Sequence, residues 1–143
     1  MVDSSVFVSF FNDKDIFNKK TTKLFEHFSQ EKSVELILPI IVFLEITHVL
    51  QKILINFDGQ QIFKIFSSSK MLDLTYSQAN DLLPIMASLS LKTNDAAITA
   101  IAKVTSSTLI TWDNKLQKEA IKLVKTYTPQ EFMKIAEKST RKF

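Results

Sequence analysis

The sequence contains no cysteine and only one glycine, and each shortage excludes a class of site. Without cysteine there is no disulfide framework and no thiolate chemistry, and a reducing interior such as the cytoplasm suits the chain best. The single glycine, Gly59, excludes the glycine-rich loops that cradle phosphates in nucleotide-binding proteins. Any chemistry that the chain performs therefore has to come from other side chains.

Long apolar segments are also missing. The longest uncharged apolar run covers residues 36–44 and stops at Glu45, well short of the thickness of a bilayer. Near the N-terminus, Asp3 stands where a signal peptide would carry basic residues. The sequence therefore predicts a cytoplasmic protein with no membrane segment.

Length and composition are typical of one globular domain. The 143 residues are 45% hydrophobic and 23% charged, so an apolar core can form without covalent links. No linker or repeat divides the chain, and we expect a single domain over residues 1–143. The net charge of +3 is compatible with a polyanionic partner but does not by itself indicate one.

Predicted strands alternate with predicted helices along most of the chain. Apolar runs predict strands over 35–38, 71–74, 108–111 and 125–128. Helical spacing and capping residues predict helices over 15–29, 41–56, 60–66, 75–89, 95–105 and 114–124, with a last helix beginning at Pro129. This alternation is typical of an α/β domain with a mostly parallel sheet, in which ligands bind beyond the carboxyl ends of the strands.

Two aspartates stand on either side of one helix–strand unit. Asp95 opens an alanine-rich helix that can pack closely, and Asp113 directly follows the strand 108–111, so both are expected near the edge where ligands bind. A simpler alternative remains open for both, because an aspartate in either place can cap a helix by accepting backbone N–H bonds. The neighbouring Trp112 is expected to pack against the protein rather than to stack on a base.

Two further carboxylates, Glu45 and Asp3, lie in apolar surroundings. Glu45 follows a helical turn that is apolar on all sides, so it is expected at the rim of a buried region, where a carboxylate requires a partner. Asp3 adjoins an apolar run, although aspartate is disfavoured in strands. The alternatives are a solvent-facing stripe shared with His48 for Glu45, and a solvated chain end for Asp3.

A bound cation would explain the four carboxylates together. Four negative groups at one sheet edge would repel one another, and a divalent cation is the simplest partner that relieves the repulsion. Carboxylate ligands without cysteine or a histidine pair favour Mg²⁺ or Mn²⁺ over zinc. The sequence therefore predicts a magnesium or manganese site that uses Asp3, Glu45, Asp95 and Asp113.

Five short motifs follow one another along the chain: Asp3-Ser4-Ser5, Phe43-Leu44-Glu45-Ile46, Asn94-Asp95-Ala96-Ala97-Ile98, Thr111-Trp112-Asp113 and Thr128-Pro129-Gln130-Glu131-Phe132. In this order they resemble the PIN domain, a metal-dependent nuclease fold. The resemblance implies three layers, α/β/α, around a central and mostly parallel sheet. It also implies a helix over residues 6–11, although Val6, Phe7 and Val8 favour a strand by local propensity.

Similarity to the VapC-type toxins of this family implies a ribonuclease that depends on Mg²⁺ or Mn²⁺. The four carboxylates would bind the metal and act in catalysis, and Ser5 and Thr111 would orient the carboxylates or a bound water. The implied partners are RNA, an antitoxin protein and a second copy of the chain in a homodimer. Many family members carry another acidic residue soon after the last aspartate, where this chain has Asn114 and Lys115. The alternative is therefore a PIN-fold RNA-processing or binding module with little catalytic activity.

Overall fold

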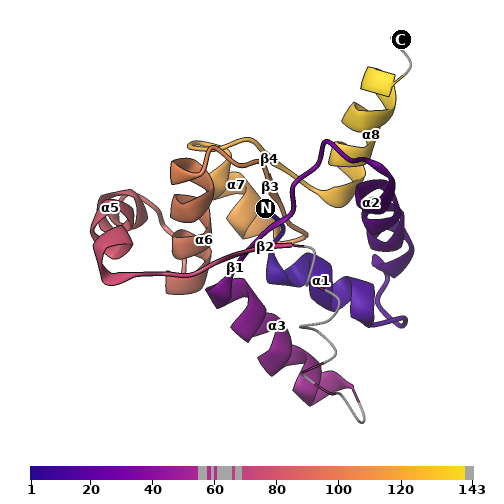
Figure 1. Ribbon diagram of the computed structural model, residues 1–143, viewed down its shortest axis with the longest axis horizontal. Helices are drawn as coiled ribbons and strands as arrows, with labels where there is room; N and C mark the ends of the chain where they lie inside the picture. Colours follow the sequence, from indigo (N-terminus) through magenta and orange to yellow (C-terminus); the bar gives the residue numbers. More distant parts are fainter. Residues whose placement is uncertain (55–57, 59, 61–65, 67–68, 141–143) are drawn as a thin grey trace.

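The computed structural model of the chain describes residues 1–54, 58, 60, 66 and 69–140 (Figure 1). Its helices are α1 (Ser4–Phe11), α2 (Asn18–Gln30), α3 (Ile40–Ile53), α5 (Tyr76–Ala87), α6 (Thr93–Val104), α7 (Asn114–Ala120) and α8 (Pro129–Thr140). Its strands are β1 (Ile37–Pro39), β2 (Lys70–Leu72), β3 (Leu109–Ile110) and β4 (Thr126–Tyr127). The helix predicted over 60–66 lies almost wholly outside the described residues. None of the described helices is long and apolar enough to cross a bilayer.

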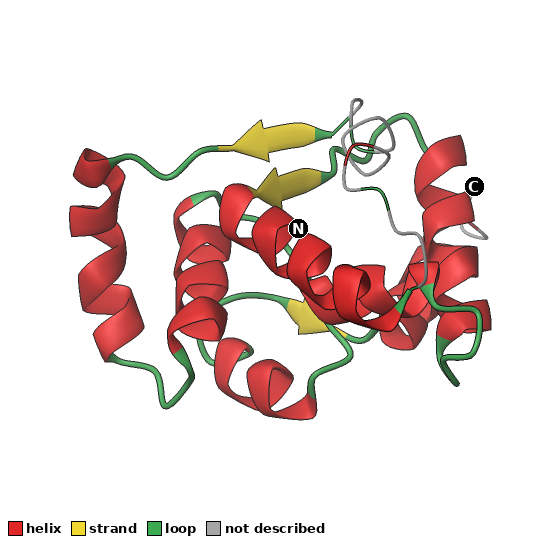
Figure 2. Cartoon of the chain, turned by 90° about the horizontal axis from the view of Figure 1, so that it is seen from below, coloured by secondary structure: helices red, strands yellow, loops and turns green. Residues whose placement is uncertain are grey.

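The strands pair in parallel, as the alternation of strands and helices predicted. β1 pairs with β2 and β3 pairs with β4, and Val2 forms a further parallel bridge to Ile110. Within the described residues these are two separate two-stranded ladders and not one continuous sheet. The strands have only two or three residues, and Pro39 at the end of β1 has no N–H with which to extend its ladder. The fold is therefore α/β, with short strands among many helices (Figure 2).

Helix α1 forms in a segment whose residues favour a strand locally. Phe7 is completely buried in this helix, and its ring packs against the ring of Phe25. Asp3 caps the helix by accepting the backbone N–H of Ser5. Core burial and the cap outweigh β propensity, which depends strongly on context. The helix that the PIN resemblance implied over 6–11 is confirmed, and it begins two residues earlier than expected.

Helix α6 is buried along most of its length and organises the core. Seven consecutive residues, from Ala96 to Ala102, are buried, and four of them are alanines whose small side chains let neighbouring elements approach. The fully buried side chains that complete the core come from the other elements, and the largest are Phe7, Leu24, Leu38, Ile46, Leu50, Leu109 and Leu116. Because the rest of α6 runs through the interior, the position of the half-buried Asp95 is fixed relative to the core, although Thr93 and Asn94 before it are exposed.

Side-chain caps fix the starts of α5 and α8. Thr75 and Gln78 form a reciprocal capping box at the start of α5. At α8, the Thr128 backbone N–H donates to Oε2 of Glu131 at 2.8 Å, and the Thr128 hydroxyl accepts the backbone N–H of Glu131 at 3.2 Å. These bonds satisfy N–H groups that no helical carbonyl can reach. The predicted start of the last helix at Pro129 is confirmed.

Several helix ends differ from the prediction by two residues or more, and those of α6 and α7 lie beside the expected site. α6 begins at Thr93, two residues before Asp95, and α7 ends at Ala120 and does not continue to 124. After Ala120 the chain turns tightly, because the N–H groups of Leu123 and Val124 both donate to the Ala120 carbonyl. The turn leads directly into β4, so the pairing of β4 with β3 ends α7 early.

Candidate active site

Asp3 is anchored at the carboxyl end of β3. Its backbone N–H donates to the Ile110 carbonyl at 2.9 Å, and the residue is only 3% exposed. Its carboxylate accepts hydrogen bonds from the hydroxyl of Ser5 at 2.6 Å and from the hydroxyl of Thr111 at 2.9 Å. These donors fix the orientation of the carboxylate. The solvated chain end that was the alternative for Asp3 is therefore wrong.

The same two hydroxyls connect Asp3 to the segment that follows β3. The Ser5 hydroxyl accepts the backbone N–H of Trp112 at 3.1 Å, and the Thr111 hydroxyl accepts the backbone N–H of Asp113 at 2.9 Å. Each hydroxyl thus donates to Asp3 and accepts from the chain at or beside Asp113. Asp3 and Asp113 are held in a fixed relation, although they are far apart in the sequence.

Asp113 caps helix α7 and also lines a cavity. Its Oδ1 atom accepts the backbone N–H groups of Lys115 at 2.7 Å and of Leu116 at 2.9 Å. The other carboxylate oxygen accepts no hydrogen bond from the described residues. The capping alternative is therefore correct for Asp113, but it uses only half of the carboxylate.

Asp95 does not cap its helix, so the capping alternative is wrong there. Lys92 is the residue that precedes the first turn of α6, and no side chain caps this helix. Asp95 is the third residue of the helix, and its carboxylate accepts no hydrogen bond from the described residues. Its oxygens are therefore free for another partner.

Glu45 is half-buried in the second turn of α3, at the rim that the sequence predicted. Its Oε2 atom is buried and has no hydrogen-bond partner among the described residues. Burial raises the pKa of Glu45 and the negative charge of Asp3 raises it further, whereas the side chains of Ser4 and Asn94 and the charge of Lys92 lower it. A buried carboxylate oxygen without a donor is unfavourable, so this position favours a positive partner.

Glu45, Asp95 and Asp113 line one cavity of about 400 Å³. The lining is completed by Lys92, Thr93 and Asn94. Burial raises the pKa of Asp95 to about 6, with further contributions from the negative charges of Asp3, Asp113 and Glu45. The structure therefore brings the four predicted carboxylates together, three at the cavity wall and Asp3 close enough to act on two of them.

The donor set fits a hydrated hard cation. The charged oxygens at the cavity all belong to carboxylates, which Mg²⁺ and Mn²⁺ prefer. Among the described residues, no three histidine, aspartate or glutamate side chains are close enough to hold one ion together. Mg²⁺ commonly takes only one or two carboxylates directly and keeps several waters. The unpartnered Oε2 of Glu45 and the raised pKa of Asp95 both favour a positive partner at this cavity.

Comparison with known proteins identifies the family. The sequence pattern that defines the PIN domain matches residues 1–122. The chain belongs to the PIN-domain family. No curated protein is similar enough in sequence to count as a match.

Solved structures share this PIN fold at low sequence identity. A toxin–antitoxin complex from Klebsiella pneumoniae matches with a TM-score of 0.68 and 17% identity, over 90% of this chain and 95% of that chain. VapC20 of Mycobacterium tuberculosis, described as a sarcin-ricin loop cleaving toxin, gives 0.63 and 14%, over 82% and 92%. FitAB bound to a DNA fragment gives 0.61 and 16%, over 90% and 93%. At these identities the likeness shows the fold alone.

Sequence reasoning missed the polar residues just before Asp95 in this PIN domain. Lys92, Thr93 and Asn94 line the cavity, and the Asn94 side chain also acts on Glu45. The available signal was their position, because they lead into the helix that carries Asp95.

Two aromatic residues that could have belonged to the site lie outside the cavity lining. The Trp112 ring stacks on Phe17, with 4.3 Å between ring centroids, and its Nε1–H donates to the Thr21 hydroxyl at 2.9 Å. The packing role predicted for Trp112 is therefore confirmed. His48 is exposed on α3, as expected for a histidine on a polar stripe.

Proposed function

We propose that this PIN domain is a divalent-metal-dependent ribonuclease and acts as the toxin of a toxin–antitoxin pair. The observation that carries the proposal is that four carboxylates converge: the negative charges of Asp3, Asp113 and Glu45 each raise the pKa of Asp95. Membership of a family of nucleases supports the activity. The toxins among the similar structures support the biological role.

In this proposal the chain's own residues bind the ion and orient the site. Mg²⁺ or Mn²⁺, when bound, would lower the pKa of a coordinated water and polarise the scissile phosphate. One or two of the wall carboxylates Glu45, Asp95 and Asp113 would hold the ion directly and water would complete its coordination, and Asp3 would be kept in place by its two hydroxyl donors. Because Asp95 retains a proton up to about pH 6, the ion has to displace that proton, and metal affinity should rise with pH.

Cleavage of structured RNA by the purified chain tests the activity. We expect cleavage with Mg²⁺ or Mn²⁺, products that carry a 5′-phosphate and a 3′-hydroxyl, and no cleavage with EDTA. Asp95→Asn should reduce the rate by more than the roughly 10–100-fold typical of residues that only support a metal ligand. Cleavage that survives EDTA, or that persists undiminished in Asp95→Asn, would refute the metal mechanism.

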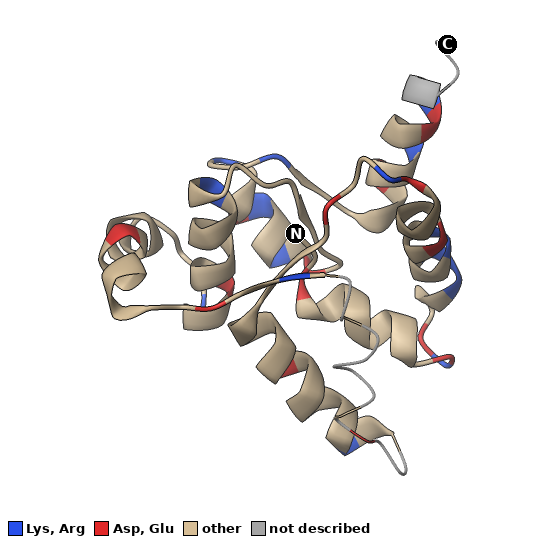
Figure 3. Ribbon diagram, viewed as in Figure 1, with Lys and Arg blue, Asp and Glu red and all other residues tan. Residues whose placement is uncertain are grey.

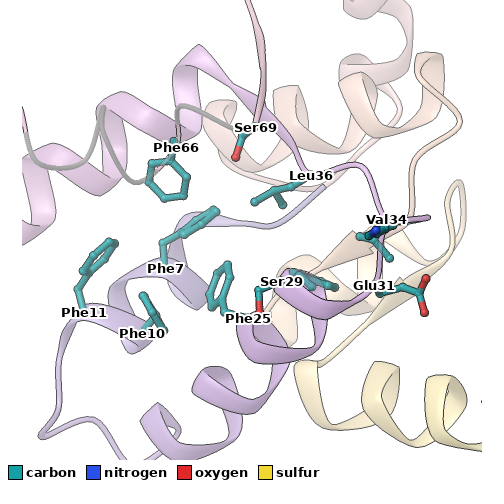
Figure 4. A pocket seen from close by; sticks show the side chains of 12 residues that line it. Phe7, Phe10, Phe11, Phe25, Ser29, Glu31, Val34, Leu36, Phe66 and Ser69 are labelled. Carbon is teal, nitrogen blue, oxygen red and sulfur yellow. The ribbon is translucent and has the colours of Figure 1, made fainter.

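The proposed antitoxin partner has an apolar surface on which to pack. A cavity of about 470 Å³ lies between α1, α2 and the segment before β1 (Figure 4). Its aromatic lining consists of Phe7, Phe10, Phe11, Phe25, Phe28 and Phe66. Glu31 and Lys32 are the charged residues among those that line it, so this cavity is chemically unlike the carboxylate site. We place an apolar segment of the antitoxin here.

The antitoxin proposal can be tested with the protein that is encoded beside the gene for this chain. A short upstream reading frame with a DNA-binding N-terminus should yield a protein that co-purifies with this chain and inhibits cleavage. Ser29→Arg, at the exposed rim of the aromatic cavity, should weaken the complex. Ser88→Arg is the matched control, because both serines are exposed and donate to the carbonyl three residues earlier. Equal effects of the two variants would exclude this cavity as the docking surface.

The proposed toxin role also includes a homodimer, which can be tested separately from the antitoxin. α5 exposes Tyr76 (89%) and Leu83 (58%), which gives a second chain apolar side chains to contact. Sedimentation equilibrium of the purified chain should give twice the monomer mass of 16.4 kDa. A strictly monomeric chain at micromolar concentration would contradict the dimer without affecting the proposed chemistry.

A binding module with little catalysis is the second candidate. It is favoured by the spacing of the carboxylates, since no three described side chains can hold one ion together. It is also favoured by Asn114 and Lys115, which stand where the resemblance to the PIN domain implies a further acidic residue. Mn²⁺ titration separates the candidates. A chain that binds no Mn²⁺ at millimolar concentration, but still binds RNA or a protein, would be such a module.

A further inference from the structure

Lys92 is the one basic residue among those that line the carboxylate cavity. Its backbone is extended, with φ −65° and ψ 158°, and its carbonyl accepts the N–H of Ala96 at 2.9 Å. The start of α6 therefore fixes where the lysine stem begins. The side chain is exposed and long enough to move its ammonium over the mouth of the cavity.

The ammonium of Lys92 is not committed to a partner inside the protein. The ion pairs found among the described residues are Lys70–Glu35 and Lys122–Glu119, and no described side chain or carbonyl accepts a hydrogen bond from Lys92. Its positive charge is nevertheless close enough to Glu45 and Asp95 to lower the pKa of both carboxyls. Lys92 is thus close to the cluster but outside direct contact with it.

This arrangement differs from an internal substitute for the metal ion. An ammonium that replaced the cation would contact the carboxylates directly, and Lys92 makes no such contact within 4 Å. It also differs from an ordinary surface lysine, because it shares one cavity with three carboxylates. A group in this position can attract a negatively charged ligand to a site whose other charges would repel it.

We infer that Lys92 binds a backbone phosphate of the RNA and positions the strand over the carboxylate cluster. The inference rests on the proposed ribonuclease function. An ammonium at the mouth offsets part of the repulsion between the phosphodiester and the three carboxylates of the wall. The contact is to the backbone, so it should be independent of the RNA sequence.

The loop that carries Lys92 lies against a second basic element. The backbone of Ser90 is close enough to Glu119 of α7 to help lower the pKa of that carboxyl, after the larger effect of the Lys122 hydrogen bond. α7 itself carries the exposed Lys115 and Lys118 (Figure 3). A strand held by Lys92 could therefore continue along a basic surface.

The test measures RNA binding in EDTA, so that it does not depend on cleavage. The probe is a fluorescent structured RNA, and its affinity for the full chain is measured over a range of salt concentrations. Lys92→Gln should reduce the slope of log affinity against log salt by about 0.7–0.9, the effect of one phosphate contact. Between about 50 and about 200 mM salt the variant should then lose about threefold less affinity than the wild type.

Lys103→Gln is the matched control, because Lys103 is an exposed lysine at the other end of the same helix and outside the carboxylate cavity. It removes the same charge and should leave the slope unchanged. Lys92→Arg should restore most of the slope. In cleavage assays Lys92→Gln should raise KM several-fold and keep kcat, because it removes a contact that binds the RNA without taking part in the reaction. If Lys92 had a purely structural role, the variant would show a lower thermal stability instead.

The outcomes separate this inference from the proposed function. A wild type that binds RNA but does not cleave it refutes the ribonuclease, and the salt slope still decides the role of Lys92. An unchanged slope in Lys92→Gln, or equal changes in Lys92→Gln and Lys103→Gln, overturns the inference. So does a variant that binds Mn²⁺ more tightly with RNA binding unchanged, because Lys92 would then compete with the metal. Absence of RNA binding by the wild type overturns both.

Discussion

At Asp113, one side chain serves both helix α7 and the cavity. Its Oδ1 atom caps the helix, and the residue also lines the carboxylate cavity. Asparagine keeps an equivalent acceptor, so Asp113→Asn should change the free energy of unfolding of the metal-free protein by less than about 0.5 kcal/mol. Mn²⁺ should raise the Tm of the wild type, and Asp113→Asn should lose both this rise and the proposed cleavage activity. Thermal unfolding with Mn²⁺ and with EDTA measures the first effect.

Asp81→Asn is the control for this experiment. Asp81 is an exposed aspartate of α5 and does not line the carboxylate cavity. Its variant should respond to Mn²⁺ like the wild type. An Asp113→Asn protein that keeps full activity and the full metal-induced shift would remove Asp113 from the site.

Asp95 should make the metal-free protein less stable as the pH rises. Its pKa is about 6 in the folded chain, above the ordinary value of 3.8. Between about pH 4 and 6 the folded chain therefore binds more protons than the unfolded chain, and the free energy of unfolding falls as the pH increases. Glu45, whose pKa is also raised, acts in the same direction. Asp95→Asn should flatten this fall, as measured by urea unfolding in EDTA across this window.

The difference between the two proteins isolates Asp95 from the other titrating groups. Mn²⁺ should restore the stability of the wild type above pH 6 and have little effect on the variant. Identical pH slopes for the two proteins would show that Asp95 does not hold a proton in this window.

The sequence correctly predicted which carboxylates come together. It was less successful in predicting whether each carboxylate caps a helix or lines the cavity. Asp113 both caps α7 and lines the cavity, so the two interpretations of this residue in the sequence were not exclusive. At Asp95 the capping alternative failed because the helix begins two residues earlier, and helix boundaries depend on backbone geometry. Lys92 could not be recognised, since a lysine before a helix acquires meaning only when a cavity forms beside it.

Among the elements, the link between α1 and the end of β3 depends on Thr111. Its buried hydroxyl donates to Asp3 and accepts the backbone N–H of Asp113. Thr111→Val keeps the shape but leaves that N–H without its acceptor, which should cost about 1–3 kcal/mol of unfolding free energy. Mn²⁺ affinity and cleavage should fall by roughly 10–100-fold, the usual effect of losing a group that orients a ligand.

Thr111→Ser is the matched control, because it keeps the hydroxyl and removes only a methyl group. It should retain most of the metal affinity that Thr111→Val loses. If the serine and valine variants lose metal affinity equally, then packing at this position matters and the hydroxyl does not.

Predictions for elements succeeded where periodicity and caps agree, and failed where tertiary contacts decide. The capped starts of α5 and α8 were readable because the capping residues lie beside each other in the sequence. In α1, local propensity favoured a strand, and only the order of the family's motifs indicated the helix. The early end of α7 follows from the pairing of β4 with β3, a contact that no local pattern records.

For the whole molecule, a divalent ion should act as a stabilising ligand. An ion that binds only the folded chain adds about 2.7 kcal/mol to the free energy of unfolding at 100 times its Kd. Urea unfolding at several Mn²⁺ concentrations should follow this logarithmic dependence, and an equal ionic strength of KCl should not. Stability that is independent of Mn²⁺ would favour the binding module over the metal enzyme.

The family and the α/β class were predictable at this scale because the motifs occur in a fixed order along the chain. The division of the strands into two separate ladders was not predictable. Strand runs in the sequence show where a ladder can form, but its length depends on which backbone groups meet across it. In the part of the chain that the structure describes, the expected central, mostly parallel sheet consists of two short parallel ladders and the bridge at Val2.

The hydrogen bond from Thr111 to Asp3 joins residues 108 positions apart. Asp113 comes later still, so a ribosome has to make most of the 143 residues before the carboxylates can assemble. During that time the nascent chain emerges beside ribosomal and messenger RNA without a complete site. If the chain is a ribonuclease, this topology would delay its activity until the segment that carries Asp113 has been synthesised, and the nearby RNA would meet no complete site before then.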